Sequence, residues 1–335
     1  MLSKPKNPPS FAEACIVSAD KRWKEHWLHR VQKIVHWKSF ARELEKLYNP
    51  NEGRPAWDPV MLFRCLLLAE WNGLSDRALE EALEFRIDFK KFAGLEVDAP
   101  VPDATTFVVF RDRIQPIRTR LLERLDRQLR EAGFEVHRAI AVDATLVEAH
   151  CMPTKNDDEE GGSSGGDPDA SWRGFPVKKQ VDGEGNEVIS RRMALYGYKV
   201  NLAASVGTGF VSGVSVCKAS EHETHHLQEF VRPGTRRMYA DKGYVGNRQY
   251  LRDEAIIDGI MAKASRGHSL TQQEQEHNAR IVKRRRIVEG VFGSWKQWYR
   301  WKKTRFMGLA RNHLGVLMTA MAWNMKKWVM IELRA

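Results

Sequence analysis

The chain has 335 residues, with 54 Lys and Arg against 43 Asp and Glu, and its formal net charge is +11. That length permits about two domains, and a hydrophobic fraction of 42% is enough for cores of ordinary size. The basic excess makes an acidic polymer or an anionic surface the leading class of partner.

Composition also argues against membrane and disulfide-rich classes. The most apolar runs, 60–69 and 314–323, are interrupted by Arg64 or followed by lysines, and each is shorter than a membrane span. The four cysteines are scattered without a Cys-x-x-Cys pair, which argues against a disulfide scaffold and a cysteine zinc site. We therefore expect a cytoplasmic protein in a reducing compartment.

Residues 1–135 carry the sequence signals of helices. Asp58 precedes Pro59 and an apolar run, the usual pattern of an N-cap followed by proline in the first turn. Ser75 and Asp103 precede further stretches in which apolar residues recur at helical spacing. The segment predicts an all-helical N-terminal domain.

The pattern changes near Phe134. Residues 135–147 form a β-branched run typical of a buried strand, and two similar runs flank Gly207-Thr-Gly as in a hairpin. An acidic stretch rich in Gly and Ser within residues 153–175 predicts a flexible loop.

After the hairpin, short strands alternate with helices. The predicted strands cover 237–241 and 256–262, and a long helix that ends near Arg300 follows them. This order predicts an α/β domain over 136–311, which resembles the ribonuclease-H-like fold. An amphipathic C-terminal helix is expected over 312–335.

Three carboxylates stand out by position. Asp143 lies inside the apolar strand, Asp241 ends a short strand, and Glu289 lies on the long basic helix. A buried carboxylate is costly unless it is paired or binds a metal. Three carboxylates brought together can hold two divalent cations about 3.5–4 Å apart, and Mg²⁺ suits oxygen ligands. Each residue also has a plainer interpretation, as a turn cap or arginine partner for the aspartates and an intrahelical ion pair for Glu289.

Cations and aromatic residues alternate around the end of the long helix. Lys283–Arg286 are four consecutive cations, and further cations over 296–305 are interleaved with Trp298, Tyr299 and Trp301. Cations bind phosphates and aromatic rings stack on unpaired bases, so the segment predicts a nucleic-acid contact. The alternative is a solvated cationic face whose aromatic residues belong to the core.

Three histidines, His222, His225 and His226, lie close together in the sequence. Without cysteine partners or a second carboxylate pattern, they are better interpreted as surface or core histidines than as metal ligands. Glu221 and His222 follow the third predicted strand, so we expect them near the active site.

The three carboxylate blocks resemble those of bacterial insertion-sequence DDE transposases, in particular the group called insertion sequence five. The blocks are Asp143 in the first strand, Tyr-Ala-Asp241-Lys-Gly-Tyr, and Arg285 followed by Glu289 four residues later and Lys296 seven residues after that. The third block is the most specific, because it fixes three residue types at fixed spacing.

The resemblance covers residues 50–325. Tyr196-Gly-Tyr-Lys-Val-Asn-Leu is similar to the second strand of that group, and Pro102-Asp-Ala-Thr-Thr-Phe is similar to the end of its helical region. One departure is Val282, which stands where the wider pattern has a tyrosine three residues before the arginine.

The resemblance implies a DNA transposase with a ribonuclease-H-like catalytic domain. Asp143, Asp241 and Glu289 would bind two Mg²⁺ ions, with Mn²⁺ left open, and would catalyse cleavage of the element ends and joining of the 3′-hydroxyl to target DNA. The helical region 1–135 would bind element ends and help two chains form a homodimer. The protein would then act in the cytoplasm at the bacterial nucleoid, with no membrane partner.

Candidate DNA contacts combine the basic helix with cations near the carboxylate blocks. The residues are Arg284, Arg285, Arg286, Lys296, Trp298, Arg300, Lys302, Lys303, Arg305, Lys199 and Lys242. Two other functions stay open: a catalytically inactive DNA-binding protein descended from such an enzyme, and a structure-specific nuclease of the same fold.

Overall fold

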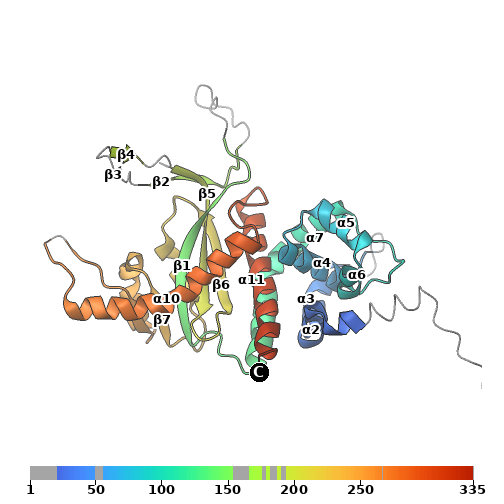
Figure 1. The fold of residues 1–335 in the computed structure, drawn as a ribbon, viewed down its shortest axis with the longest axis horizontal. Coiled ribbons are helices and arrows are strands. Elements are labelled where there is room, and N and C mark those ends of the chain that lie inside the picture. The colour runs from blue at the N-terminus through green and yellow to red at the C-terminus, as the bar shows by residue number, and fades with distance from the viewer. Residues whose placement is uncertain are drawn as a thin grey trace, which may run out of the picture.

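The computed structural model describes residues 21–49, 56–153, 166–175, 179–181, 187–189, 194–265 and 267–334. The ribbon has a helical part beside a part built on a β-sheet (Figure 1). The helical part contains α2 (Trp27–Ile34), α3 (Trp37–Leu44), η1 (Glu45–Leu47), α4 (Pro59–Asn72), α5 (Asp76–Phe85), α6 (Ile87–Ala93), α7 (Ala104–Ile114), η2 (Gln115–Ile117) and α8 (Arg118–Glu131).

Local capping interactions fix where the predicted helices begin. The Asp58 side chain accepts a hydrogen bond from the Val60 N–H at 2.9 Å, and the Asp103 side chain accepts one from the Thr106 N–H at 2.6 Å. Ser75 caps α5 in the same way. Each cap satisfies a backbone donor that the first turn leaves free, so the helix starts predicted at these three residues are confirmed.

The sheet is mixed, with an antiparallel half and a parallel half. Antiparallel pairing joins β1 to β5 and β5 to β6, whereas β7 runs parallel to both β1 and β8. The strands are β1 (Ala139–Glu148), β2 (Ser171–Gly174), β5 (Ala194–Ser205), β6 (Val211–Lys218), β7 (Arg237–Ala240) and β8 (Ile257–Ile260), with a separate pair of β3 (Lys179–Val181) and β4 (Glu187–Ile189). The predicted hairpin and both short strands are confirmed.

One strand lies inside the segment 153–175 that the sequence marked as a loop. β2 pairs antiparallel with the start of β5, and the ring of Trp172 packs 5.2 Å from that of Tyr196. Cross-strand aromatic pairing stabilises this addition to the sheet. Residues 154–165, which hold most of the Gly/Ser-rich stretch, lie outside the described residues.

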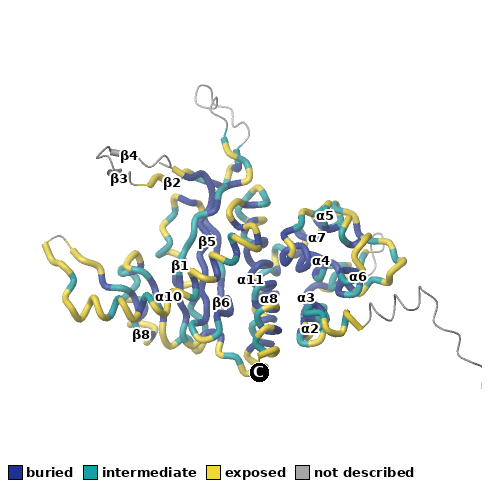
Figure 2. Tube along the Cα trace, in the orientation of Figure 1, coloured by how far each residue is buried: buried dark blue, intermediate teal, exposed yellow. Residues whose placement is uncertain are grey.

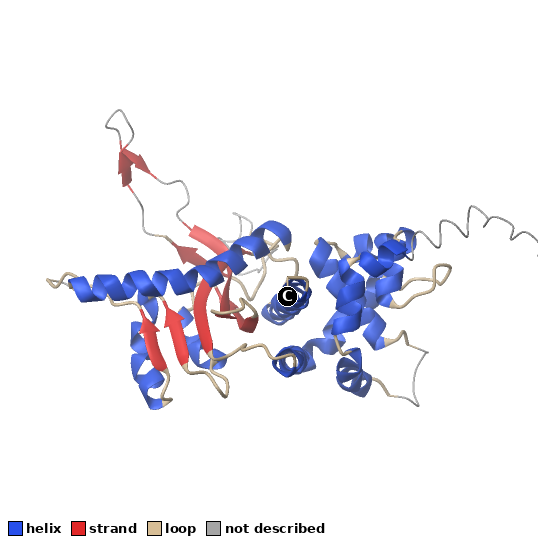
Figure 3. Cartoon of the chain, turned by 60° about the horizontal axis from the view of Figure 1, so that its bottom comes forward, coloured by secondary structure: helices blue, strands red, loops and turns tan. Residues whose placement is uncertain are grey.

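Helical elements cover both faces of the sheet (Figure 3). Ala141 of β1 belongs to the same hydrophobic cluster as Val288 of α10 (Gln272–Trp298), whereas its neighbours Ile140 and Val142 belong to a second cluster on the opposite face. That opposite face is covered by η3 (Glu223–Phe230), η4 (Lys242–Asn247) and α9 (Arg248–Asp253).

The last helix, α11 (Leu309–Glu332), is buried almost all round, so the predicted amphipathic pattern is wrong. It packs against β6 on one side and against α2, α4, α7 and α8 on the other, and the tube is dark blue over much of its length (Figure 2). Asn324 tolerates this burial because its amide pairs with both backbone groups of Val211 at 2.8 Å.

One hydrophobic cluster therefore runs from the N-terminal helices through α11 to the sheet. The boundary expected at residue 135 falls in the connection between α8 and β1. Within the part of the chain that the structure describes, no helix is long and apolar enough to cross a membrane.

Candidate active site

The register of the parallel strands brings two of the predicted carboxylates together. β1 pairs with β7 from Ala139 opposite Arg237 to Ala141 opposite Tyr239. Two residues further along each chain, the same register sets Asp143 opposite Asp241, which directly follows β7. Side chains two residues apart in a strand share a face, so Asp143 and Asp241 continue the face of Ala141 and Tyr239. Because neighbouring strands lie about 4.8 Å apart, both carboxylates lie side by side at one edge of the sheet.

Asp143 is partly buried and is held by an arginine from α10. Its Oδ2 accepts a hydrogen bond from Arg285 Nη2 at 2.7 Å, and its Oδ1 accepts one from the Ala144 N–H at 2.9 Å. Burial is the main cause of a raised pKa at Asp143, and the negative charge of Asp241 acts in the same direction while Arg285 opposes both. The positive charge of Arg285 therefore lowers the cost of ionising this partly buried carboxyl group.

Asp241 forms the N-cap of η4. Its Oδ1 accepts a hydrogen bond from the Gly243 N–H, which fixes the start of the short helix against the sheet edge. Tyr244, in the same turn, is buried beneath the carboxylates. Burial raises its pKa, and the charges of Asp143 and Glu223 add to the effect.

Helix α10 is anchored to β1 at two points, and Glu289 lies between them. Arg285 contacts Asp143, and Lys296 Nζ donates a hydrogen bond to Thr145 Oγ1 at 2.6 Å. Glu289 is one turn beyond Arg285, rotated by about 40° around the helix, and its side chain is exposed.

Glu289, the third carboxylate, therefore lies on the helix that crosses the site. It is exposed to solvent between the residues, Arg285 and Lys296, that attach this helix to β1. In the described chain, the ligand oxygens of Asp143, Asp241 and Glu289 do not all lie within 4.8 Å of one another. All three offer oxygen donors, the donor type that Mg²⁺ prefers, so the residues fit a hard divalent cation.

A fourth carboxylate, Glu223, borders the same edge. A methyl group on Gly243 would lie 3.3 Å from Asp241 Oδ1 and 3.4 Å from Glu223 Oε1, so the two side chains flank one glycine. Lys199 Nζ pairs with Glu223 Oε2 at 2.7 Å. No fixed spacing marked Glu223 in the sequence; the only signal was that its segment follows the third predicted strand, which is the second strand of the hairpin.

The predicted DNA contacts divide into exposed cations and cations engaged within the protein. Lys199 and Arg285 are buried in ion pairs with Glu223 and Asp143, and Arg305 pairs with Glu70. Lys296 is partly buried on Thr145. The exposed members of the set are Arg284, Arg286, Trp298, Arg300, Lys302, Lys303 and Lys242.

Two of the interleaved aromatic residues belong to the core. Tyr299 and Trp301 are 5% and 3% exposed, and the Trp301 indole N–H donates to Thr319 Oγ1 at 2.7 Å. Trp298 is 67% exposed. Of the three, only Trp298 is accessible to a base, so the core alternative holds for the other two.

A basic groove that the sequence did not reveal runs between α10 and the β7–β8 edge. It has a volume of about 570 Å³ and is lined by Arg237, Arg280, Lys283 and Arg284 together with Tyr239. Three of its cations come from two neighbouring turns of α10, and the fourth comes from the start of β7. Arg237 could not be assigned to this groove from the sequence, because only the tertiary fold brings β7 beside α10.

Comparison with protein families agrees with this geometry. A family model described as a transposase domain (DUF772) matches residues 17–113, which covers α2 to α7. A second model, described as a transposase DDE domain, matches residues 135–325, more than half of the chain, and includes all three carboxylates and α10. The chain therefore belongs to the DDE transposases of insertion sequences.

Proposed function

We propose that this transposase cleaves the ends of its own insertion sequence and joins the freed 3′-hydroxyl to target DNA at a site formed by Asp143, Asp241 and Glu289. The observation that carries the proposal is the parallel pairing of β1 with β7, whose register, continued two residues past its last pair, sets Asp143 opposite Asp241, together with the bond from Arg285 of the Glu289 helix to Asp143. The contact between Lys296 and Thr145 supports it, because it anchors the same helix at a second point.

The sheet supports a ribonuclease-H-like domain. Its central strands lie in the order β6-β5-β1-β7-β8, in which an antiparallel β1-β5-β6 meander is followed by two strands parallel to β1. Helical segments separate the later strands, which is the order on which the sequence-based expectation rested. The block of Arg285, Glu289 and Lys296 also supports membership of the insertion sequence five group.

The three carboxylates would supply the oxygen ligands for two Mg²⁺ ions, and Mn²⁺ is the alternative cation. When bound, such ions activate an attacking hydroxyl and stabilise the leaving oxygen on phosphorus. The protein's own part is to position these groups. Arg285 orients Asp143 and opposes the burial that raises the pKa of its carboxyl group, and the ammonium of Lys296 lies where it can hold a phosphate of the cleaved strand beside β1.

DNA would approach along the exposed cations of α10. Arg280, Lys283 and Arg284 form one side of the basic groove, and Trp298 at the end of the helix offers a face for base stacking. Holding two element ends in one complex calls for two chains, so we expect a homodimer on DNA that acts at the nucleoid.

Reversing two charges in the groove tests this path. We expect Arg280→Glu with Arg284→Glu to weaken binding to end DNA at every sequence tested and to reduce the slope of log K against log salt by about two, because each lost phosphate contact removes about one released counterion. The control is Arg252→Glu, an exposed arginine of α9 on the opposite face. Equal losses in both variants would argue against the groove.

A metal-dependent stability test addresses Asp143. In Arg285→Met the partly buried carboxylate of Asp143 loses its guanidinium partner, so we expect the free energy of unfolding in EDTA to fall by about 1–3 kcal/mol. Mg²⁺ is expected to restore most of this stability by replacing the guanidinium charge. Thermal unfolding with and without Mg²⁺ measures this. Arg286→Met, an exposed neighbour, serves as the control, and a loss that Mg²⁺ leaves unchanged would contradict cation binding at Asp143.

The reaction itself is tested with purified protein, a labelled duplex that carries the element's own end, supercoiled target and Mg²⁺. Products joined to the target support the proposed transposition. Cleavage without joining would instead indicate a structure-specific nuclease, and binding without cleavage would indicate an inactive DNA-binding descendant.

A further inference from the structure

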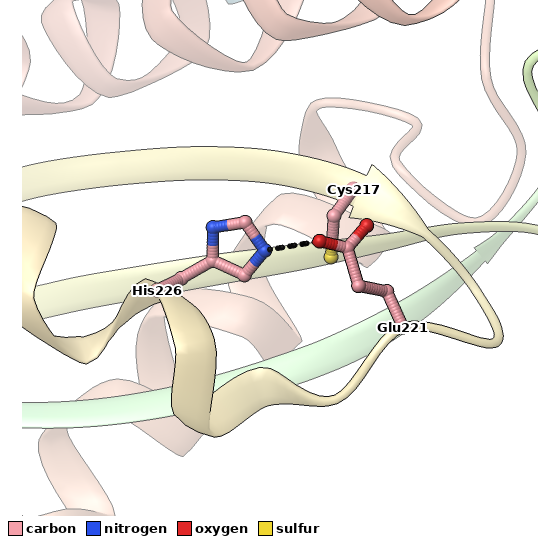
Figure 4. Close-up of side chains that lie close together, drawn as sticks. All are labelled: Cys217, Glu221 and His226. Atoms are coloured by element: carbon pink, nitrogen blue, oxygen red, sulfur yellow. Dashed lines mark ion pairs between the residues drawn. The ribbon is translucent and has the colours of Figure 1, made fainter.

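A second cluster of metal-ligating side chains lies at the edge of the sheet, at the end of β6. Cys217 is the second-last residue of that strand, Glu221 lies in the following turn, and His226 lies on η3. One ligand atom from each residue lies within 4.8 Å of the other two, and the three side chains converge in Figure 4. Among the described residues this is the only such group of three or more His, Cys, Asp and Glu.

The histidine ring is oriented toward the other two residues by a carboxylate behind it. His226 Nδ1 lies 2.7 Å from Glu229 Oε1. A hydrogen bond there places a proton on Nδ1, so Nε2 is the nitrogen that faces the other two residues, the arrangement that metal-bound histidines commonly have. Hydrogen bonds with Cys217 and Glu229 raise the pKa of His226 to about 10, so a bound metal would displace a proton from Nε2. His226 Nε2 is buried, and although it lies 3.3 Å from Glu221 Oε1 it makes no hydrogen bond of good geometry.

The sulfur faces polar groups of β5. Cys217 is buried, the Asn201 side-chain amide donates a weak hydrogen bond to Sγ at 3.5 Å, and Sγ in turn donates to the Lys199 carbonyl at 3.8 Å. A metal binds cysteine as the thiolate, so binding here would release the thiol proton. Glu221 is 41% exposed, so its carboxylate has room to move toward an ion.

We propose that Cys217, Glu221 and His226 bind one Zn²⁺ ion, with water as the fourth ligand. A thiolate, an imidazole and a carboxylate are the three ligand types of protein zinc sites, whereas the oxygen-only carboxylates of the candidate active site suit Mg²⁺. Tetrahedral zinc needs ligand atoms about 3.3–3.8 Å apart. His226 Nε2 and Glu221 Oε1 are already 3.3 Å apart, and the side chain of Glu221 is exposed enough to adjust to an ion.

The zinc ion would cross-link η3 to the end of β6. The segment it closes contains Glu223, which pairs with Lys199 and borders Asp241. The ion would therefore fix the segment that brings this fourth carboxylate to the candidate active site, without itself touching the DNA. The sequence had argued against a metal at these histidines because it showed no cysteine partners and no second carboxylate pattern.

Zinc binding by the full chain tests the proposal. Metal-free protein is titrated with Zn²⁺ against a chromogenic chelator, and bound metal is counted by mass spectrometry. We expect a single equivalent per chain that is lost in Cys217→Ser and His226→Ala, with folding checked by circular dichroism. The matched controls Cys151→Ser and His225→Ala keep it, as does Asp143→Asn, which separates this site from the Mg²⁺ carboxylates.

Two further measurements keep the test decisive if a variant fails to fold. Co²⁺ added to the unaltered chain is expected to give a thiolate-to-cobalt charge-transfer band, and Glu229→Gln is expected to weaken Zn²⁺ binding about 10–100-fold by releasing the His226 ring. The proposal is overturned by absence of the cobalt band, by no stoichiometric zinc in the unaltered chain, by binding unchanged in both ligand variants, or by zinc lost in Asp143→Asn.

Discussion

Replacing any one of Asp143, Asp241 and Glu289 by its amide is expected to lower the rate of strand cleavage by at least about 10³-fold. The amide keeps the shape of the side chain but removes the charge that holds a divalent cation. Binding to end DNA is expected to stay within a few-fold, because the cations along α10 are untouched. Single-turnover cleavage of a labelled end in Mg²⁺ and a parallel binding titration measure the two quantities.

The matched control for Glu289 is Glu276→Gln. Glu276 is exposed on the same helix, more than three turns from Glu289 and away from the sheet edge. The Glu276→Gln variant is expected to cleave DNA at the rate of the unaltered chain. Near-normal cleavage by any of the three active-site variants would remove that residue from the catalytic set, and a common loss of DNA binding would point to misfolding instead.

Removing Arg305 is expected to destabilise the fold by about 3–5 kcal/mol, because it leaves Glu70 buried and charged without its partner. Glu70 on α4 is 6% exposed, its Oε1 pairs with Arg305, and its Oε2 accepts a hydrogen bond from Thr319 Oγ1 of α11 at 2.7 Å. The network joins the helical part, the segment after α10 and α11. Chemical unfolding of Arg305→Ala measures the loss.

Two comparisons separate burial from charge. Arg311→Ala removes an exposed ion pair with Asp112 and is expected to cost less than about 1 kcal/mol. In the double variant Glu70→Leu with Arg305→Met both charges disappear, so much of the stability is expected to return. Unchanged stability of Arg305→Ala together with lost DNA binding would contradict this account and return Arg305 to the DNA-contacting residues.

The sequence predicted the elements whose signals are local. Asp58, Ser75 and Asp103 predicted where helices start, because a capping side chain bonds to the backbone two or three residues away. The hairpin around Gly207 and the apolar strand around Asp143 were likewise set by nearby residues. Asp143 stood out because an ionisable group in an apolar strand needs a partner, and the structure supplies Arg285 as that partner.

The predictions that failed depended on contacts between distant segments. The α11 helix was expected to be amphipathic, but sheet and helices enclose it from two sides, which no periodicity of its own reveals. Tyr299 and Trp301 alternate with cations as a nucleic-acid contact does, yet their rings pack into the core. The sequence also did not show that Cys217 and His226, nine residues apart, lie together, which follows from the way η3 folds back over the end of β6.

The most direct test of the active-site assignment is a switch in metal preference, measured as cleavage of a labelled end by Asp143→Cys and by Asp241→Cys in Mg²⁺ and in Mn²⁺. Sulfur is a poor ligand for Mg²⁺ and a better one for softer cations. If these side chains bind the metal, both variants lose cleavage in Mg²⁺ and recover part of it in Mn²⁺. Unaltered cleavage in Mg²⁺, or a loss that Mn²⁺ relieves at neither position, would contradict metal binding by the two aspartates.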